Sequence, residues 1–385
     1  PRPIRFAWWG LAMPGLVLNY FGQGALMLRD SSAIASPFYS LVPQGGWTYA
    51  LVILATLATI IASQALISGA FSLTHQAVQL GYFPRVTVRH TSRMTEGQIY
   101  IPQINWLLMI ACVVLVLSFK ESTKLAAAYG IAVTGTMGIT SIVYYVVTRR
   151  TWGWPLWRSA ALLVLFLSFD IPFFAANLLK LFEGGYVPIL VGAAFFLVMI
   201  TWKRGRTLLG EYIVQRSPDM DSFLQNIDSE IVRCAGTGVF MASNSGRVPP
   251  ILFHQAQRIK VLHKTVILFT VITEHVPALE HGKRLELVSL GCGFYRVLAR
   301  CGFMESPNVP VLLEEAIDRL GLGKAATDHV TYYVGRETFL ATGNGKMGRW
   351  SETIFAFLSR NAQPATMYFG IPPDKVVELG TQIDL

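Results

Sequence analysis

The stretch ALVILATLATIIASQALISGAFSLTHQAVQLGYFP, from Ala50 to Pro84, decides the fold class of this chain. It belongs to a longer run, residues 31–84, that contains no Asp, Glu, Lys or Arg. About 20 apolar residues cross the hydrocarbon core of a bilayer as a helix, whereas the water-facing surface of a soluble domain carries charge. The stretch therefore predicts a membrane-spanning helix.

Polar side chains form two sets at helical spacing within this stretch, namely Thr56, Thr59 and Ser63, and Gln64, Ser68 and Ser72. Each set lies on one face of a helix. Hydroxyl and amide oxygens are suitable ligands for a dehydrated hard cation, but the same groups also form hydrogen bonds between membrane helices. The spacing leaves both interpretations open.

The composition extends the membrane interpretation to half of the chain. Of the 385 residues, 52% are hydrophobic and 14% are charged, against about 25% charged in average globular proteins. The long apolar runs lie before residue 203, and ordinary soluble composition follows. We expect a transmembrane domain over residues 1–203 and a cytoplasmic α/β domain over residues 204–385.

Six hydrophobic spans are expected in the first domain, over residues 6–28, 47–73, 101–119, 125–147, 156–179 and 186–202. Basic residues gather before the first span, in every second loop and after the sixth span, as at Arg85, Arg149 and Lys203. By the positive-inside rule these segments are cytoplasmic, so both ends of the chain face the cytoplasm of a multi-pass cell-membrane protein. The net charge of +9 has the same explanation, and nucleic acid is not an expected partner.

Alternating patterns after residue 206 predict a compact α/β domain. Strands are expected over residues 238–242, 265–273, 283–290, 293–299 and 329–334, and helices over residues 221–233, 251–263, 309–320 and 350–360. Asn308 is placed to cap the helix over 309–320. The four cysteines lack metal spacing, and no nucleophile–base arrangement is visible. We expect neither an enzyme nor a bound metal or cofactor.

Asp170 is the acidic residue inside an apolar span, where Pro172 follows it and is expected to interrupt the helix. A carboxylate at bilayer depth costs about 2.5–3.5 kcal/mol and is a functional candidate by default. The competing interpretation, which we favour, is a structural Asp that forms a hydrogen bond with a neighbouring helix. Glycines at 22, 24, 130 and 135 mark either helix breaks or packing faces, and their spacing favours packing.

Several long motifs resemble one family of proteins. They are NYFGQGALML (19–28), ATIIASQALISGAFSLTHQAVQLGYFPR (58–85), HTSRMTEGQIYIPQINW (90–106), LAAAYGIAVTGTM (125–137), DIPFFAANLLK (170–180) and RNAQPATMYFGIPPDKVVELGTQIDL (360–385). Together they closely resemble the bacterial Kup potassium-uptake permeases of the KUP/HAK/KT family. The resemblance runs nearly from end to end and is weakest between residues 203 and 350.

The resemblance implies K⁺ transport, with K⁺/H⁺ symport by alternating access in a LeuT-like, APC-type bundle. It also implies that the six spans match helices seven to twelve of a twelve-helix transporter, so that the chain is the C-terminal half. The span over 47–73 would then flank the substrate site, and the candidate ion-pathway residues are Thr59, Ser63, Gln64 and Ser68. Asp170 would lie outside the ten-helix core.

The expected partners are K⁺ and H⁺ as transported ions, the lipid bilayer, the missing N-terminal half of the same transporter, and a second copy in a homodimer. Two alternatives stay open. An APC-superfamily amino-acid permease would transport an organic solute, and a ligand-sensing module would regulate a membrane transporter.

Overall fold

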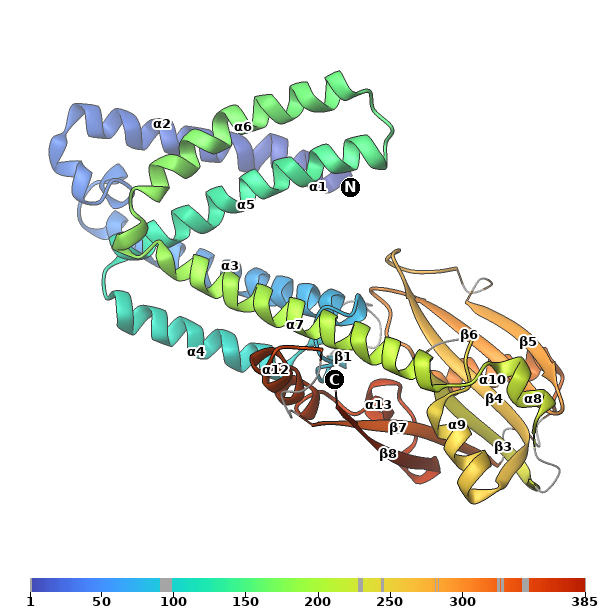
Figure 1. Cartoon of the computed structure of the whole chain (residues 1–385). Coiled ribbons are helices and arrows are strands. Elements are labelled where there is room, and N and C mark those ends of the chain that lie inside the picture. The colour runs from blue at the N-terminus through green and yellow to red at the C-terminus, as the bar shows by residue number, and fades with distance from the viewer. Residues whose placement is uncertain are drawn as a thin grey trace. The chain divides into compact units, whose positions relative to one another are not determined.

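The computed structural model describes residues 2–90, 99–227, 231–243, 246–280, 282, 284–323, 326, 329–340 and 346–384 (Figure 1). The chain divides into two compact units, residues 1–70 and 71–385. The boundary between them falls inside the long helix α3 (Gly46–Gln79).

The first unit is helical. Helix α1 (Arg2–Ala7) continues through a π-helical turn, Trp8–Ala12, into α2 (Met13–Arg29). Pro14 lies in the first turn of α2, directly after this π-helical turn. Helix α2 is unbroken through Gly22 and Gly24. A Cβ atom added at Gly22 would lie 3.7 Å from the Leu41 side chain, which is an ordinary contact distance. The helix-break interpretation of these two glycines is therefore wrong.

The second unit begins with the end of α3 and contains four further long helices, which are α4 (Pro102–Phe119), α5 (Ser122–Arg150), α6 (Leu156–Leu178) and α7 (Tyr186–Arg216). A two-stranded hairpin of β1 (Arg89–His90) and β2 (Ile99–Tyr100) precedes α4. Within the described residues, six helical segments are long and apolar enough to cross a membrane. The six expected spans are thereby confirmed.

Two details of the spans differ from expectation. Helix α6 passes through Asp170 and Pro172 without a break, because membrane helices tolerate an internal proline when neighbouring groups satisfy the freed carbonyl. Helix α7 continues well beyond Trp202 to Arg216. The expected domain boundary at residues 203–204 thus falls within one continuous helix.

A six-stranded sheet forms the centre of the C-terminal domain, with strand order β5-β6-β4-β3-β7-β8. Its strands are β3 (Val232–Ala242), β4 (Val261–Glu274), β5 (Leu285–Gly291), β6 (Phe294–Gly302), β7 (Val330–Leu340) and β8 (Val376–Asp384). All neighbouring pairs are parallel except β5 with β6. The parallel strands follow the order of a doubly wound sheet, which confirms the expected α/β class.

Helices cover both faces of this sheet. The helices are α8 (Met220–Gln225), α9 (Pro250–His254), α10 (Val309–Leu320), α12 (Arg349–Arg360) and α13 (Ala365–Tyr368). Alternation along β3 sends Val239 into the core beneath α10 and Phe240 into the core beneath α9. Asn308 accepts a hydrogen bond from the Val311 N–H at 3.3 Å, so the expected helix cap is confirmed.

Two helices expected in this domain extend too far, and one strand was not expected. The helix expected over 251–263 ends at Ile259, and residues 261–263 begin β4. The helix expected over 221–233 ends at Gln225, and β3 begins at Val232. The edge strand β8 was not expected at all, although it pairs with β7 over nine residue positions. Pairing between β3 and β4 overrides local helical periodicity at residues 232–233 and 261–263.

Candidate functional site

The candidate ion-pathway residues Thr59, Ser63, Gln64 and Ser68 all lie on α3, and their side chains are exposed. The Thr59 hydroxyl donates a hydrogen bond to the Ala55 carbonyl at 2.8 Å. This bond satisfies the donor and leaves the lone pairs of the hydroxyl oxygen available to an ion. A regular helix thus supplies oxygen atoms of the type that hard cations bind.

The helix does not place the four residues on one face. Ser63 and Gln64 are consecutive, so they are about 100° apart around the helix axis. Thr59 shares the side of Ser63, and Ser68 shares the side of Gln64. A single ion path can therefore be lined by one pair or by the other, and sequence spacing alone could not choose between them.

The fifth candidate, Asp170, belongs to the second unit and is buried on α6. Its carboxylate accepts a hydrogen bond from the Ser141 hydroxyl of α5 at 2.6 Å. Ser141 is buried too. The burial cost of the carboxylate is therefore partly offset by a donor on the neighbouring helix.

Asp170 is one of several contacts along the antiparallel pair of α5 and α6. Closer to the α5–α6 turn, the Thr148 hydroxyl donates to the Ser159 hydroxyl at 3.0 Å. Towards the far end, Gly130 lies so close to the Asn177 side chain that a Cβ atom there would collide with it. The helices stay side by side along their length (Figure 1). This setting favours a role for Asp170 in helix packing.

A second cluster lies where α3 ends, and we call it the Gln79 junction, comprising Gln79, Thr273, Glu305 and Tyr368. The Gln79 side-chain amide donates to the Glu305 carbonyl at 2.7 Å. Its oxygen accepts from the Tyr368 hydroxyl at 2.8 Å and from the Thr273 hydroxyl at 3.5 Å. Gln79 is buried. One side chain therefore links α3 to strand β4, to the loop after β6 and to α13.

The partners in the Gln79 junction are themselves held in place. The Glu305 carboxylate accepts from the Gly302 N–H at 2.7 Å and pairs with Arg284. The pKa of Tyr368 is raised to about 12, chiefly by burial, while nearby Arg85 opposes the rise. The phenol consequently stays protonated and remains a donor to Gln79 at any physiological pH.

The segment after α3 continues the attachment to the C-terminal domain. The Arg85 carbonyl accepts from the Gln363 N–H at 2.7 Å, and the Arg85 guanidinium lies 5.8 Å from the centre of the Tyr368 ring. Burial lowers the pKa of Arg85, with Arg206 adding to the effect. Sequence reasoning identified Arg85 only as a topology signal and missed Gln79, because their partners lie more than 200 positions away.

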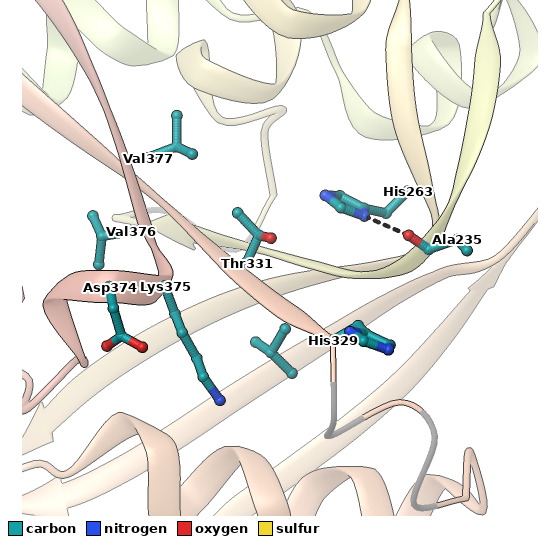
Figure 2. Close-up of a pocket in the computed structure, with 9 residues that line it drawn as sticks. Ala235, His263, His329, Thr331, Asp374, Lys375, Val376 and Val377 are labelled. Carbon is teal, nitrogen blue, oxygen red and sulfur yellow. Dashed lines mark hydrogen bonds between the residues drawn. The ribbon is translucent and has the colours of Figure 1, made fainter.

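A cavity of about 670 Å³ opens in the C-terminal domain at the amino ends of the parallel strands (Figure 2). Its lining includes His263, His329, Asp374 and Lys375. The His263 ring contacts the Ala235 carbonyl at 3.4 Å. Doubly wound sheets ordinarily bind ligands at the carboxyl ends of their strands, so this cavity lies at the opposite edge.

Metal binding has no support among the residues that the structure describes, where no group of three His, Cys, Asp or Glu side chains comes together. The cavity offers two imidazoles, one ammonium and one carboxylate for a small polar ligand. Sequence analysis identified none of these four as site residues, because they come together from strand β4, from the turn before β7 and from the short 3-10 helix before β8.

Two family models match the chain in consecutive order. Residues 1–207 match the K⁺ potassium transporter integral membrane domain, and residues 235–385 match the K⁺ potassium transporter C-terminal domain. No solved structure matches the chain significantly. The matched ranges correspond to the long apolar helices and to the α/β domain.

Similar proteins carry names of the same kind. A protein from Syntrophobacter fumaroxidans named "Probable potassium transport system protein Kup 1" is 51% identical over 383 residues, which cover 99% of this chain and 58% of the relative. A Kup protein from Anaeromyxobacter sp. strain Fw109-5 is 50% identical, again over 58% of its length. A Kup 1 protein from Geobacter sulfurreducens is 48% identical over 60% of its length.

The chain thus spans somewhat more than half the length of these relatives. Kup potassium transporters are membrane transporters and not enzymes. Because the membrane-domain model alone covers more than half of the chain, and the C-terminal model covers most of the rest, the chain belongs to the K⁺ potassium transporter family.

Proposed function

We propose that this chain is part of a transporter that moves K⁺ across the cell membrane. The observation that carries the proposal is the match to both potassium transporter models in consecutive order. The six apolar helices supply the membrane part that such a transporter needs. Since the chain spans 58% of the length of its relatives, transport is proposed for the whole protein.

The proposed mechanism is alternating access in a LeuT-like bundle, with K⁺ held by oxygen ligands near the middle of the membrane. One wall would come from α3, through the Thr59–Ser63 side or the Gln64–Ser68 side. The hydroxyl and amide oxygens of these residues support this role, because hard cations bind oxygen ligands. We propose that the C-terminal half of the transporter is represented and that the rest supplies the other walls.

Coupling to H⁺ is proposed from the family resemblance, as K⁺/H⁺ symport. Asp170 is an unpromising proton carrier, because its carboxylate already accepts a buried hydrogen bond from Ser141 at a helix–helix contact. The coupling group is therefore expected elsewhere in the transporter.

We propose that both ends of the chain face the cytoplasm, with transmembrane residues 1–203 followed by a cytoplasmic domain over 204–385. The hydrogen bond between Arg85 and Gln363 supports this orientation. It requires the basic segment after α3 to lie on the same side of the membrane as the C-terminal domain. That is also the side that the positive-inside rule assigns to Arg85.

The decisive experiment is expression of the full-length gene in a host that lacks its own K⁺ uptake systems. Growth on low K⁺ and Rb⁺ uptake are expected to be restored. A well-expressed protein that restores neither would contradict the proposal. Residues 1–385 alone are expected not to carry Rb⁺ into liposomes.

The alternative of an amino-acid permease gains no support from the relatives, whose names refer to potassium transport. A ligand-sensing role for the C-terminal domain has one observation in its favour, the cavity that contains His263, His329 and Lys375. It predicts that Lys375→Ala and His329→Ala change the regulation of Rb⁺ uptake but not its maximum rate.

A further inference from the structure

Helix α12 carries an apolar stripe on its outer side. Trp350, Ile354 and Phe357 fall at i, i+4 and i+7, so they share one helical face. Trp350 is 85% exposed and Phe357 is 64% exposed. Soluble surfaces seldom leave large side chains uncovered at helical spacing, and such a face marks an interaction site.

The inner side of α12 packs on the membrane helix α7 (Figure 1). The buried Phe355 ring lies 5.3 Å from the Trp202 ring. Gly205 lies one turn later on α7, and a Cβ atom there would collide with Phe355. This close approach fixes α12 against α7 at the level of residues 202–205.

That level is the end of the apolar part of α7. The apolar run from Tyr186 ends at Trp202, and the basic residues Lys203, Arg204 and Arg206 follow directly. Tryptophan and basic residues of this kind mark the boundary between hydrocarbon and headgroups. Trp202 is itself buried, so α12 covers it and presents its own aromatic residues outward at the same depth.

Charge on α12 favours an anionic partner. Arg349 and Arg360 are exposed at the two ends of the helix, before and after the apolar stripe. The structure describes every residue of α12, and its one acidic residue, Glu352, is buried. Apolar residues flanked by exposed arginines are the composition of a helix that lies in the plane of an anionic membrane surface.

We propose that α12 is an interfacial helix that inserts Trp350, Ile354 and Phe357 into the headgroup region of an anionic bilayer. The C-terminal domain is then attached to the membrane at two places, through α7 and through α12. The inference does not depend on which ion the protein carries, because it concerns only depth, apolar exposure and charge.

The test measures the surroundings of α12 in the full chain in lipid vesicles. Phe357→Cys is made in a background in which the four native cysteines are Ala, and it is labelled with a nitroxide. The vesicles contain phosphatidylethanolamine and phosphatidylglycerol. Collision rates with oxygen, which concentrates in lipid, and with a water-soluble nickel chelate are measured by EPR. Val311→Cys on the exposed side of α10 is the matched control.

The ratio of oxygen to nickel collision rates at position 357 is expected to be several-fold higher than at position 311. A ratio equal to that of the control would place α12 in water and overturn the proposal. Low rates with both reagents would place the stripe against protein, such as a second copy of the chain, and would overturn it as well.

A second measurement needs no substitution. Hydrogen exchange of the α12 amides is compared for the unmodified chain in nanodiscs of phosphatidylglycerol and of phosphatidylcholine. Slower exchange over residues 349–360 is expected in the anionic nanodiscs, while α10 exchanges equally in both. Equal exchange of α12 in the two lipids would contradict the anionic-surface assignment.

Discussion

The Gln79 side-chain oxygen accepts a hydrogen bond from the Tyr368 hydroxyl at 2.8 Å, across 289 positions of sequence. Gln79 ends α3, and Tyr368 ends α13. The bond therefore joins the helix that carries the candidate ion-pathway residues to the C-terminal domain. Gln79 is buried and Tyr368 is half-buried, so losing this bond leaves a buried Gln79 acceptor without one of its donors, at a cost in stability.

Tyr368→Phe is expected to lower the free energy of unfolding by about 1 kcal/mol, since it removes one part-buried hydrogen bond. Gln79→Leu is expected to cost more, about 1–3 kcal/mol, because it leaves several partners unsatisfied. Thermal unfolding of the full chain in detergent measures both. Tyr82→Phe is the control, because it keeps the ring that faces Lys203. Equal midpoints for all three variants would mean that the junction contributes nothing.

Gly130→Ala is expected to destabilise the α5–α6 pair, because the new Cβ would collide with Asn177. The control is Gly138→Ala on the same helix, where nothing lies within 4 Å of the new atom. That control should be neutral or slightly stabilising, since Ala favours helix by about 1 kcal/mol over Gly. Adding Asn177→Ala should rescue Gly130→Ala. If both glycine variants melt alike, the close approach is not real.

If the Gln64–Ser68 side of α3 lines the ion path, Ser68→Ala in the full-length transporter is expected to raise the KM for Rb⁺ about tenfold. The reason is that losing one ligand contact of about 1.4 kcal/mol weakens binding about tenfold. Gln64→Leu should act in the same direction. Ser63→Ala tests the opposite side of α3, and Leu66→Ala controls for general damage to the helix. Unchanged Rb⁺ kinetics in all three polar variants would remove α3 from the ion path.

Asp170→Asn is expected to leave Rb⁺ uptake and its pH dependence largely unchanged, because the amide oxygen can still accept from Ser141. Asp170→Leu should lower stability by about 1–3 kcal/mol, since the buried Ser141 hydroxyl loses its acceptor. Uptake across a pH series distinguishes the two roles. Loss of the pH dependence in Asp170→Asn would make Asp170 a proton-coupling residue after all.

Maleimide is expected to react with Cys301 at pH 8 about tenfold more slowly than with the exposed Cys292. The thiolate is the reacting form, and the buried Cys301 forms less of it. Burial, with Glu305 second, raises the pKa of Cys301 from 9.0 to about 11. Its contribution to stability is therefore complete below pH 9 and is lost as the pH rises towards 11. Mass spectrometry of timed reactions provides the rates. Comparable rates at the two cysteines would show that the Cys301 site is open to solvent.

Local residue patterns were sufficient for the membrane helices and for the class of the C-terminal domain. A helix in a bilayer satisfies its own backbone, so length and apolarity alone located the spans that begin near Trp47 and Leu156. Strand β4 was located by its β-branched core, Thr265–Thr273. Its first residues were misassigned, because Val261 and Leu262 become strand only by pairing with β3.

For the candidate sites too, some features follow from the sequence and others only from the tertiary structure. The sequence by itself determined that α3 carries oxygen-bearing side chains at helical spacing, and that Asp170 is a carboxylate within an apolar span, because both depend only on neighbours along one helix. Only the tertiary structure decided that Ser141 satisfies Asp170, that Gln79 holds the C-terminal domain and that α12 lies against Trp202. Those contacts join segments far apart in the chain, and no local pattern encodes which distant surface a side chain will meet.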